Sequence, residues 1–166
     1  MIDVIEVLTK EGEAIIDDAA AALERTNLRH YAEAGPALTR ERLTQLLALV
    51  LDCVTTRDLV PMIDYSTTVA HELGDQLDAL VSRDGATSDA QAQLAELAHA
   101  VRAFARARPD EYRLIFAPTC EATRPEPEAL AHSVGPLLRI TTELAGPNSA
   151  LDAARTVTAW ATGFIG

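Results

Sequence analysis

Histidine side chains are the first candidates for chemistry in this chain, and their spacing does not assemble a metal site. The chain has four histidines, none of them four residues from another: His30, His71, His99 and His132. The pair His71-Glu72 begins a zinc-protease pattern, but Asp75 stands where a second histidine ligand is required. We therefore expect no metal and no other cofactor, and we expect solvated or capping histidines.

Nucleophilic side chains lack the neighbours that would activate them. Cys53 lies in an apolar predicted helix, which favours an inert buried thiol over a nucleophile, and no base is evident near it. Ser66 and Ser133 lack the G-x-S-x-G turn of hydrolases, and the dispersed glycines form no phosphate-binding loop. We expect the protein not to be an enzyme.

A set of aromatic residues forms the most interesting constellation: Phe104, Tyr112, Phe116, Trp160 and Phe164. Their helical spacing fits an ordinary apolar core, and it also fits an apolar ligand pocket. In a pocket, the Tyr112 hydroxyl and the Trp160 indole would be polar tips that orient a ligand. Either group could equally bond a backbone carbonyl, so both interpretations stay open at this point.

The segment that must position these aromatics runs from Ala98 to Phe116. Apolar residues at three- and four-residue spacing predict an amphipathic helix over about 90–108. Pro109 ends that helix. Pro109 and the two acids that follow it suit the first turn of the next helix. The second helix is expected over 110–116, with Tyr112, Ile115 and Phe116 on its buried face.

The rest of the chain is also helical in pattern, and we predict an all-α helical bundle of about seven helices. Strand-like alternation is missing, and the apolar share of 48% with only 4% aromatics favours closely packed helices. The other helices are expected over about 4–29, 40–55, 60–81, 130–145 and 151–165. The apolar run Leu46–Leu51 predicts a helix that is central in the core.

The composition excludes several classes of function. A formal net charge of −11, with one lysine and scattered arginines, is unfavourable for direct nucleic-acid binding by this chain. No stretch approaches the roughly 18 apolar residues of a membrane span. The N-terminus carries acids where a secretory signal needs bases. We expect a cytoplasmic protein that does not contact a membrane.

Residues 73–166 resemble the C-terminal effector-binding domain of TetR-type transcriptional regulators. The resemblance rests on Phe104, on the run Arg108–Phe116 (RPDEYRLIF) and on Ala159–Phe164 (AWATGF). It implies helices around an apolar effector pocket, and pairing of subunits into a homodimer through the last two helices. The family's N-terminal helix-turn-helix is not found in this chain, and its final helix is expected to be truncated at Gly166.

Residues 1–72 resemble instead the helical N-terminal sensor domain of RsbR-type stress-signalling regulators. The stretch from Leu38 to Glu72 carries this likeness, which ends at Leu73. The expected organisation is therefore a sensor-like segment 1–72 followed by a TetR-like segment 73–166.

The function expected from the sequence is a non-enzymatic regulatory module for ligand sensing and dimerisation, without its own DNA-binding element. Its ligand would be a small apolar molecule that contacts the five aromatics. Two alternatives are a protein-binding module of an RsbR-type system and a purely structural helical assembly domain. The three differ in whether a small ligand, a regulatory protein or neither binds.

Overall fold

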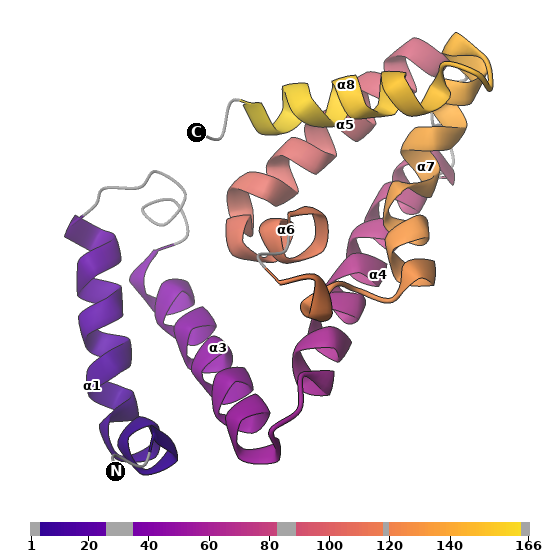
Figure 1. The fold of residues 1–166 in the computed structure, drawn as a ribbon. Coiled ribbons are helices and arrows are strands. Elements are labelled where there is room, and N and C mark those ends of the chain that lie inside the picture. The colour runs from indigo at the N-terminus through magenta and orange to yellow at the C-terminus, as the bar shows by residue number, and fades with distance from the viewer. Residues whose placement is uncertain (1–3, 26–34, 83–88, 118–119, 164–166) are drawn as a thin grey trace. The chain divides into compact units, whose positions relative to one another are not determined.

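The structure is a computed structural model that describes residues 4–25, 35–82, 89–117 and 120–163, with side chains to residue 160. In these ranges it contains seven α-helices and no strand, as predicted (Figure 1). The chain divides into two compact units, Met1–Met62 and Ile63–Gly166. The boundary expected between residues 72 and 73 falls inside a helix, and it stays a prediction of where the two sequence resemblances meet.

The first unit is built on a pair of helices, α1 (Val4–Arg25) and α3 (Pro36–Thr56), which pack along each other. Arg40 of α3 bonds Asp17 and Glu13 of α1, the latter at 2.5 Å. Gly12 lets the helices approach, because a Cβ there would lie 3.2 Å from Leu47. These contacts fix the two helices side by side.

The prediction that α3 is central in the core is wrong. Thr39 is the one described residue of α3 that is buried, whereas Leu46 is 48% exposed. The physical reason is that a helix with one neighbour covers only one stripe of its surface. An apolar run therefore shows how much surface a helix could bury, but not how much its neighbours cover.

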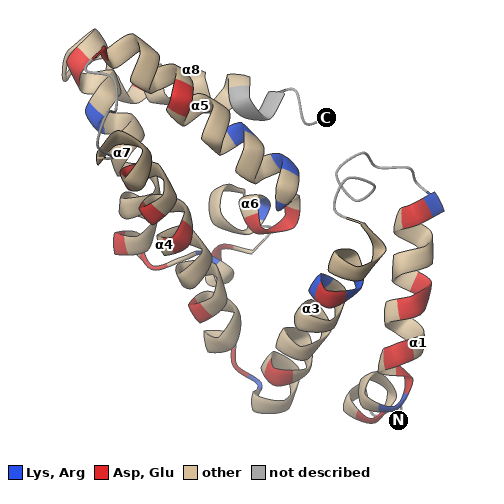
Figure 2. Ribbon diagram, turned by 180° about the vertical axis from the view of Figure 1, so that it is seen from behind, with Lys and Arg blue, Asp and Glu red and all other residues tan. Residues whose placement is uncertain are grey.

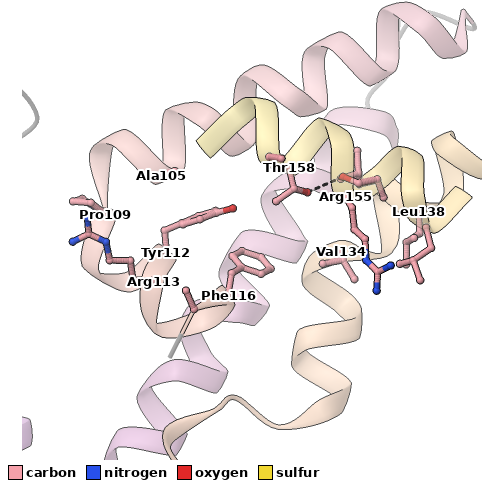
Figure 3. Close-up of a pocket in the computed structure, with 14 residues that line it drawn as sticks. Ala105, Pro109, Tyr112, Arg113, Phe116, Val134, Leu138, Arg155 and Thr158 are labelled. Carbon is pink, nitrogen blue, oxygen red and sulfur yellow. Dashed lines mark hydrogen bonds between the residues drawn. The ribbon is translucent and has the colours of Figure 1, made fainter. Parts of the chain in front are cut away.

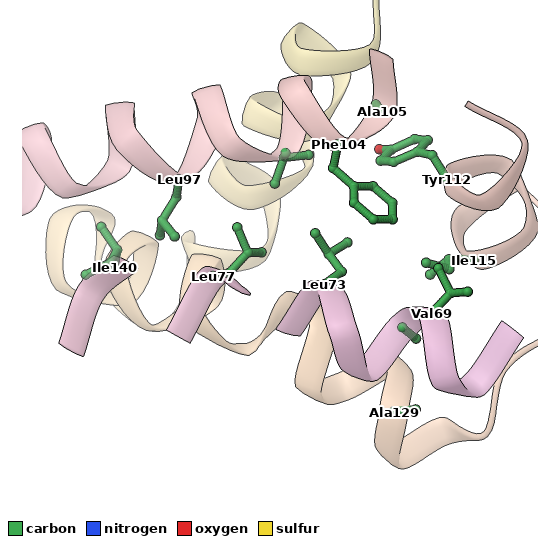
Figure 4. Packing of buried hydrophobic residues seen from close by; sticks show 12 residues of the cluster. Val69, Leu73, Leu77, Leu97, Phe104, Ala105, Tyr112, Ile115, Ala129 and Ile140 are labelled. Carbon is green, nitrogen blue, oxygen red and sulfur yellow. The ribbon is translucent and has the colours of Figure 1, made fainter. Parts of the chain in front are cut away.

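The second unit contains α4 (Val60–Ser82), α5 (Ala90–Ala107), α6 (Pro109–Phe116), α7 (Pro127–Ala145) and α8 (Ala150–Gly163). A short 3-10 turn, η1 (Glu121–Thr123), precedes α7. Helix α5 packs against α6, α7 and α8, and α7 packs against α8. The core lies where α4 to α7 meet (Figure 4). Its residues are Val69, Ala70, Leu73, Leu77, Leu97, Val101, Phe104, Ala105, Tyr112, Ile115, Ala129 and Ile140.

The helix ends that shape this unit follow from local chemistry. Asp89 caps α5 by accepting a hydrogen bond from the Gln91 backbone N–H at 3.2 Å. Pro109 begins α6 directly after α5, so that Arg108 is at once the C-cap of α5 and the N-cap of α6. This abrupt change of direction turns α6 back beside the end of α5.

Helices α4 and α7 come into close contact at Gly74. A Cβ at this position would lie 2.2 Å from the His132 ring, so a side chain there would require the ring to move. The same ring bonds Asp75 through Nε2 at 2.9 Å and lies 5.5 Å from the His71 ring between centroids. His132 is thus fixed on the surface of α4 by the absence of a side chain at residue 74.

Candidate functional site

A cavity of about 600 Å³ lies between α6, α7, α8 and the end of α5 (Figure 3). This volume is within the range of about 300–1,000 Å³ that is typical of small-molecule sites. The lining residues are mainly apolar: Ala105, Pro109, Tyr112, Arg113, Phe116, Ala117, Val134, Leu137, Leu138, Leu151, Ala154, Arg155, Thr158 and Ala159.

Helical periodicity explains why these residues share one space. From α6, Tyr112 and Phe116 are one turn apart, and their ring centroids lie 4.8 Å from each other. The residues from α8 recur at three- and four-residue intervals from Leu151 to Ala159, so one face of that helix lines the cavity. The Pro109 turn brings the α6 face into position opposite α8.

Tyr112 supplies a polar group to an otherwise apolar wall. The side chain is only 8% exposed, and its hydroxyl points into the cavity toward α8 (Figure 3). No hydrogen bond to this hydroxyl is found among the described residues. Burial raises the pKa of Tyr112 to about 12, so the hydroxyl stays protonated at neutral pH. It can therefore donate a hydrogen bond to a molecule in the cavity.

A partly buried ionic network fixes α6 from the opposite side. Arg108 bonds Glu72 of α4 at 2.8 Å and both carboxylate oxygens of Glu111. Tyr65 of α4 donates its hydroxyl hydrogen to Glu111 at 2.5 Å. Burial and the Glu111 bond raise the pKa of Tyr65 to about 12, and the Glu111 bond raises that of Arg108. The start of α6 is thus bonded to α4, which fixes the helix that carries Tyr112.

Comparison with known proteins finds one similarity, over the part of the chain that contains this pocket. A family model described as tetracyclin repressor-like, C-terminal domain, matches residues 94–166. Residues 94–166 form a TetR-like C-terminal domain. All cavity residues, from Ala105 to Ala159, lie inside that domain. Neither the curated proteins nor the solved structures contain a significant match. The match covers less than half of the chain and none of residues 1–72, whose RsbR-type resemblance stays a prediction.

The TetR-like domain brings together two of the five aromatics predicted for a ligand site. Tyr112 and Phe116 line the cavity. Phe104 is 6% exposed in the core, with the Arg108 guanidinium 5.1 Å from its ring centroid. Trp160 is 43% exposed, beside His99 and Arg102 of α5. Phe164 lies outside the described residues.

Several cavity residues of the TetR-like domain were not singled out from the sequence. Leu151, Ala154, Arg155 and Thr158 have the three- and four-residue spacing of one helix face, and this pattern could have identified them. The aromatic pattern indicates Trp160 instead, which follows the last of these positions. The arginines are scattered in the sequence, so composition alone does not indicate that Arg155 belongs to a site.

The remaining candidates for chemistry have structural partners. Ser66 bonds the carbonyls of Ile63 and Thr123, and Ser133 bonds that of Leu130. Among the described residues, no group of His, Cys, Asp and Glu could hold a metal ion. None of the described helices is long and apolar enough to cross a membrane.

The pKa of Tyr112 predicts a dependence of stability on alkaline pH. An unfolded chain ionises tyrosine near the ordinary pKa of about 10, whereas folded Tyr112 ionises near about 12. Stability is therefore unaffected below the unfolded pKa and falls as pH rises through the folded one. The melting temperature of Tyr112→Phe should decline less over this window than that of the unaltered protein. Equal declines in both proteins would contradict the assignment.

Proposed function

We propose that the TetR-like domain is the ligand-sensing and dimerisation module of a transcriptional regulator, and that this chain is not an enzyme. We also propose that its own residues do not contact DNA. The formal charge of −11 supports this last point, because an acidic surface repels the phosphate backbone. Acidic residues recur along α1 and α4 in particular (Figure 2).

The observation that carries the proposal is the cavity of about 600 Å³ inside the TetR-like domain. Its wall combines apolar side chains with a few polar groups, the composition of sites that bury a small molecule. Leu137 and Ala154 contribute buried apolar surface, while Tyr112 contributes a hydroxyl. A ligand there would contact α6, α7 and α8 together.

Such contacts give a physical route from binding to regulation. A ligand that fits one arrangement of α6 and α8 better than another favours that arrangement by the difference in its affinity. Helix α6 is bonded to α4 through Arg108 and Glu72. A change in the position of α6 would therefore act on α4 as well as on the pocket.

Exposed apolar residues on the last two helices support the dimerisation part of the proposal. Leu144 of α7 is 41% exposed and Leu151 of α8 is 51% exposed. Burial of such side chains against a second copy would remove apolar surface from water. The TetR resemblance implies pairing through these same helices.

Filling the pocket should abolish ligand binding, and α8 offers a matched pair of threonines for this test. Thr158 lines the cavity, whereas Thr156 is exposed and lies outside it. Each hydroxyl bonds the carbonyl four residues earlier. A ligand at about 100 times its Kd adds about 2.7 kcal/mol to native stability. We expect a panel of small lipophilic compounds to yield one that raises the melting temperature, and Thr158→Phe to remove that shift.

Thr156→Phe is the control, because it adds the same ring on the same helix outside the cavity. It should keep the shift caused by the compound. Loss of the shift in both variants would point to a general effect on α8, and retention in both would place the ligand elsewhere. If no compound shifts the unaltered protein, the ligand-sensing proposal fails.

A further inference from the structure

The charge of the pocket is opposite to that of the chain around it. The chain has 25 acidic residues against 14 basic ones, but no acidic residue lines the cavity. Two arginines, Arg113 and Arg155, do line it. Each pairs with an acid that is not part of the lining, Arg113 with Asp110 at 3.8 Å and Arg155 with Asp152 at 3.4 Å. Their remaining N–H donors can attract a negative group locally, although the acidic chain as a whole repels anions.

Arg155 is the arginine best placed to meet that negative group. Its side chain extends from α8 toward α7, beside Leu138, whereas Arg113 lies along α6 near Pro109 (Figure 3). Arg155 pairs with Asp152 at 3.4 Å, and the two side chains are 70% and 83% exposed. An exposed pair of this kind is weak, and the guanidinium has further N–H donors for a carboxylate.

The interior beyond Arg155 is suited to an uncharged apolar body. Val134 lies on this side of the cavity, Leu137 and Ala154 also line it, and the rings of Tyr112 and Phe116 close the α6 side. The Tyr112 hydroxyl is a neutral hydrogen-bond donor among these groups. The site therefore changes from apolar inside to cationic at the α7–α8 edge.

We propose that the ligand of this pocket is an apolar monocarboxylate, with its carboxylate at Arg155 and its apolar body between Phe116 and Leu137. The inference rests on the proposed function and adds the chemical class of the ligand. A carboxylate accepts two parallel N–H bonds from a guanidinium, which an alcohol or an amine cannot do. The carboxylate at Arg155 fixes one end of the ligand, and the fit of the apolar body in the cavity fixes the other end.

The test uses probes that share one body and differ in charge. Decanoate, decanol and decylammonium share an alkyl chain, and naphthoate and naphthalenemethanol repeat the comparison with a ring system. Binding is measured by calorimetry to the full chain at low and moderate salt. We expect decanoate or naphthoate to bind about fivefold tighter than its alcohol, as for one solvent-exposed ionic contact. This preference should shrink as salt rises, because Arg155 is exposed.

Arg155→Gln should remove the preference for the carboxylate and leave affinity for the alcohol unchanged. Arg106→Gln is the matched control: it makes the same change at an exposed position of α5 outside the cavity, and it should keep the preference. If Arg113→Gln, and not Arg155→Gln, removed the preference for the carboxylate, the assignment to Arg155 would be overturned.

The remaining outcomes separate this inference from the proposed function. Equal binding of alcohol and carboxylate, blocked by Thr158→Phe, would overturn the carboxylate class and leave the pocket as a ligand site. Tighter binding of decylammonium would also overturn it. If no probe binds, the inference fails, and the wider compound panel then decides the proposed function by itself.

Discussion

Replacing Leu97 by alanine is expected to lower the free energy of unfolding of the second unit by about 3 kcal/mol. Leu97 has no exposed surface and lies on α5 within the core formed with α4 and α7 (Figure 4). Truncation removes buried methyl groups and leaves a cavity that surrounding helices fill only in part. Urea unfolding followed by tryptophan fluorescence is the appropriate measurement, since the single tryptophan, Trp160, belongs to this unit.

Val60→Ala is the control for this prediction. Val60 is 48% exposed at the start of α4 and lies outside the helices proposed to pair, so truncation there should change stability by less than about 1 kcal/mol. A loss of stability at Val60 as large as that at Leu97 would contradict the assignment of the core. A decrease in the free energy of unfolding of well under about 1 kcal/mol for Leu97→Ala would also contradict this assignment.

Replacing Arg108 by methionine is expected to destabilise the same unit by about 2–3 kcal/mol. The guanidinium joins Glu72 and Glu111, and the Glu111 side chain is only 15% exposed. Removing the cation leaves a poorly hydrated carboxylate without its ionic partner, which costs more than the ion pair itself contributed. Chemical unfolding of the variant, with the same fluorescence signal, measures this loss.

A second substitution separates the orphaned charge from other causes. If the charge of Glu111 without Arg108 is responsible, Arg108→Met combined with Glu111→Gln should recover part of the lost stability. Arg124→Met is the exposed comparison: Arg124 pairs with Glu121 at 2.7 Å, with side chains 48% and 79% exposed, and the change should be within about 0.5 kcal/mol. A double variant less stable than Arg108→Met would contradict the explanation.

Helix positions were predictable from the sequence because apolar spacing and proline act locally. The break at Pro109 and the existence of each described helix follow from these signals. The sequence pattern predicts that α3 and α7 begin at residues 40 and 130, whereas the helices begin at Pro36 and Pro127. Proline is typical of a break between helices, but its fixed φ and missing N–H also suit the first turn of a helix.

The contacts of each helix face were less predictable. Spacing places Phe104 and Phe116 on buried faces, but it does not specify which helix lies opposite each one. Phe104 meets the core, while Phe116 lines the cavity. Trp160 meets α5 through His99 and Arg102, a contact that depends on the crossing of α5 and α8. A pocket is a property of at least three helices together, so one helix pattern cannot define it.

The close contact at Gly74 also has a consequence for how this sequence can change. A side chain at position 74 and an imidazole at position 132 would occupy the same space, since the Cβ would lie 2.2 Å from the ring. The two positions are therefore coupled: a larger residue on α4 is compatible with the same helix spacing only if the imidazole at position 132 moves or that residue becomes smaller. One glycine thus restricts the substitutions that a residue far along the chain can accept.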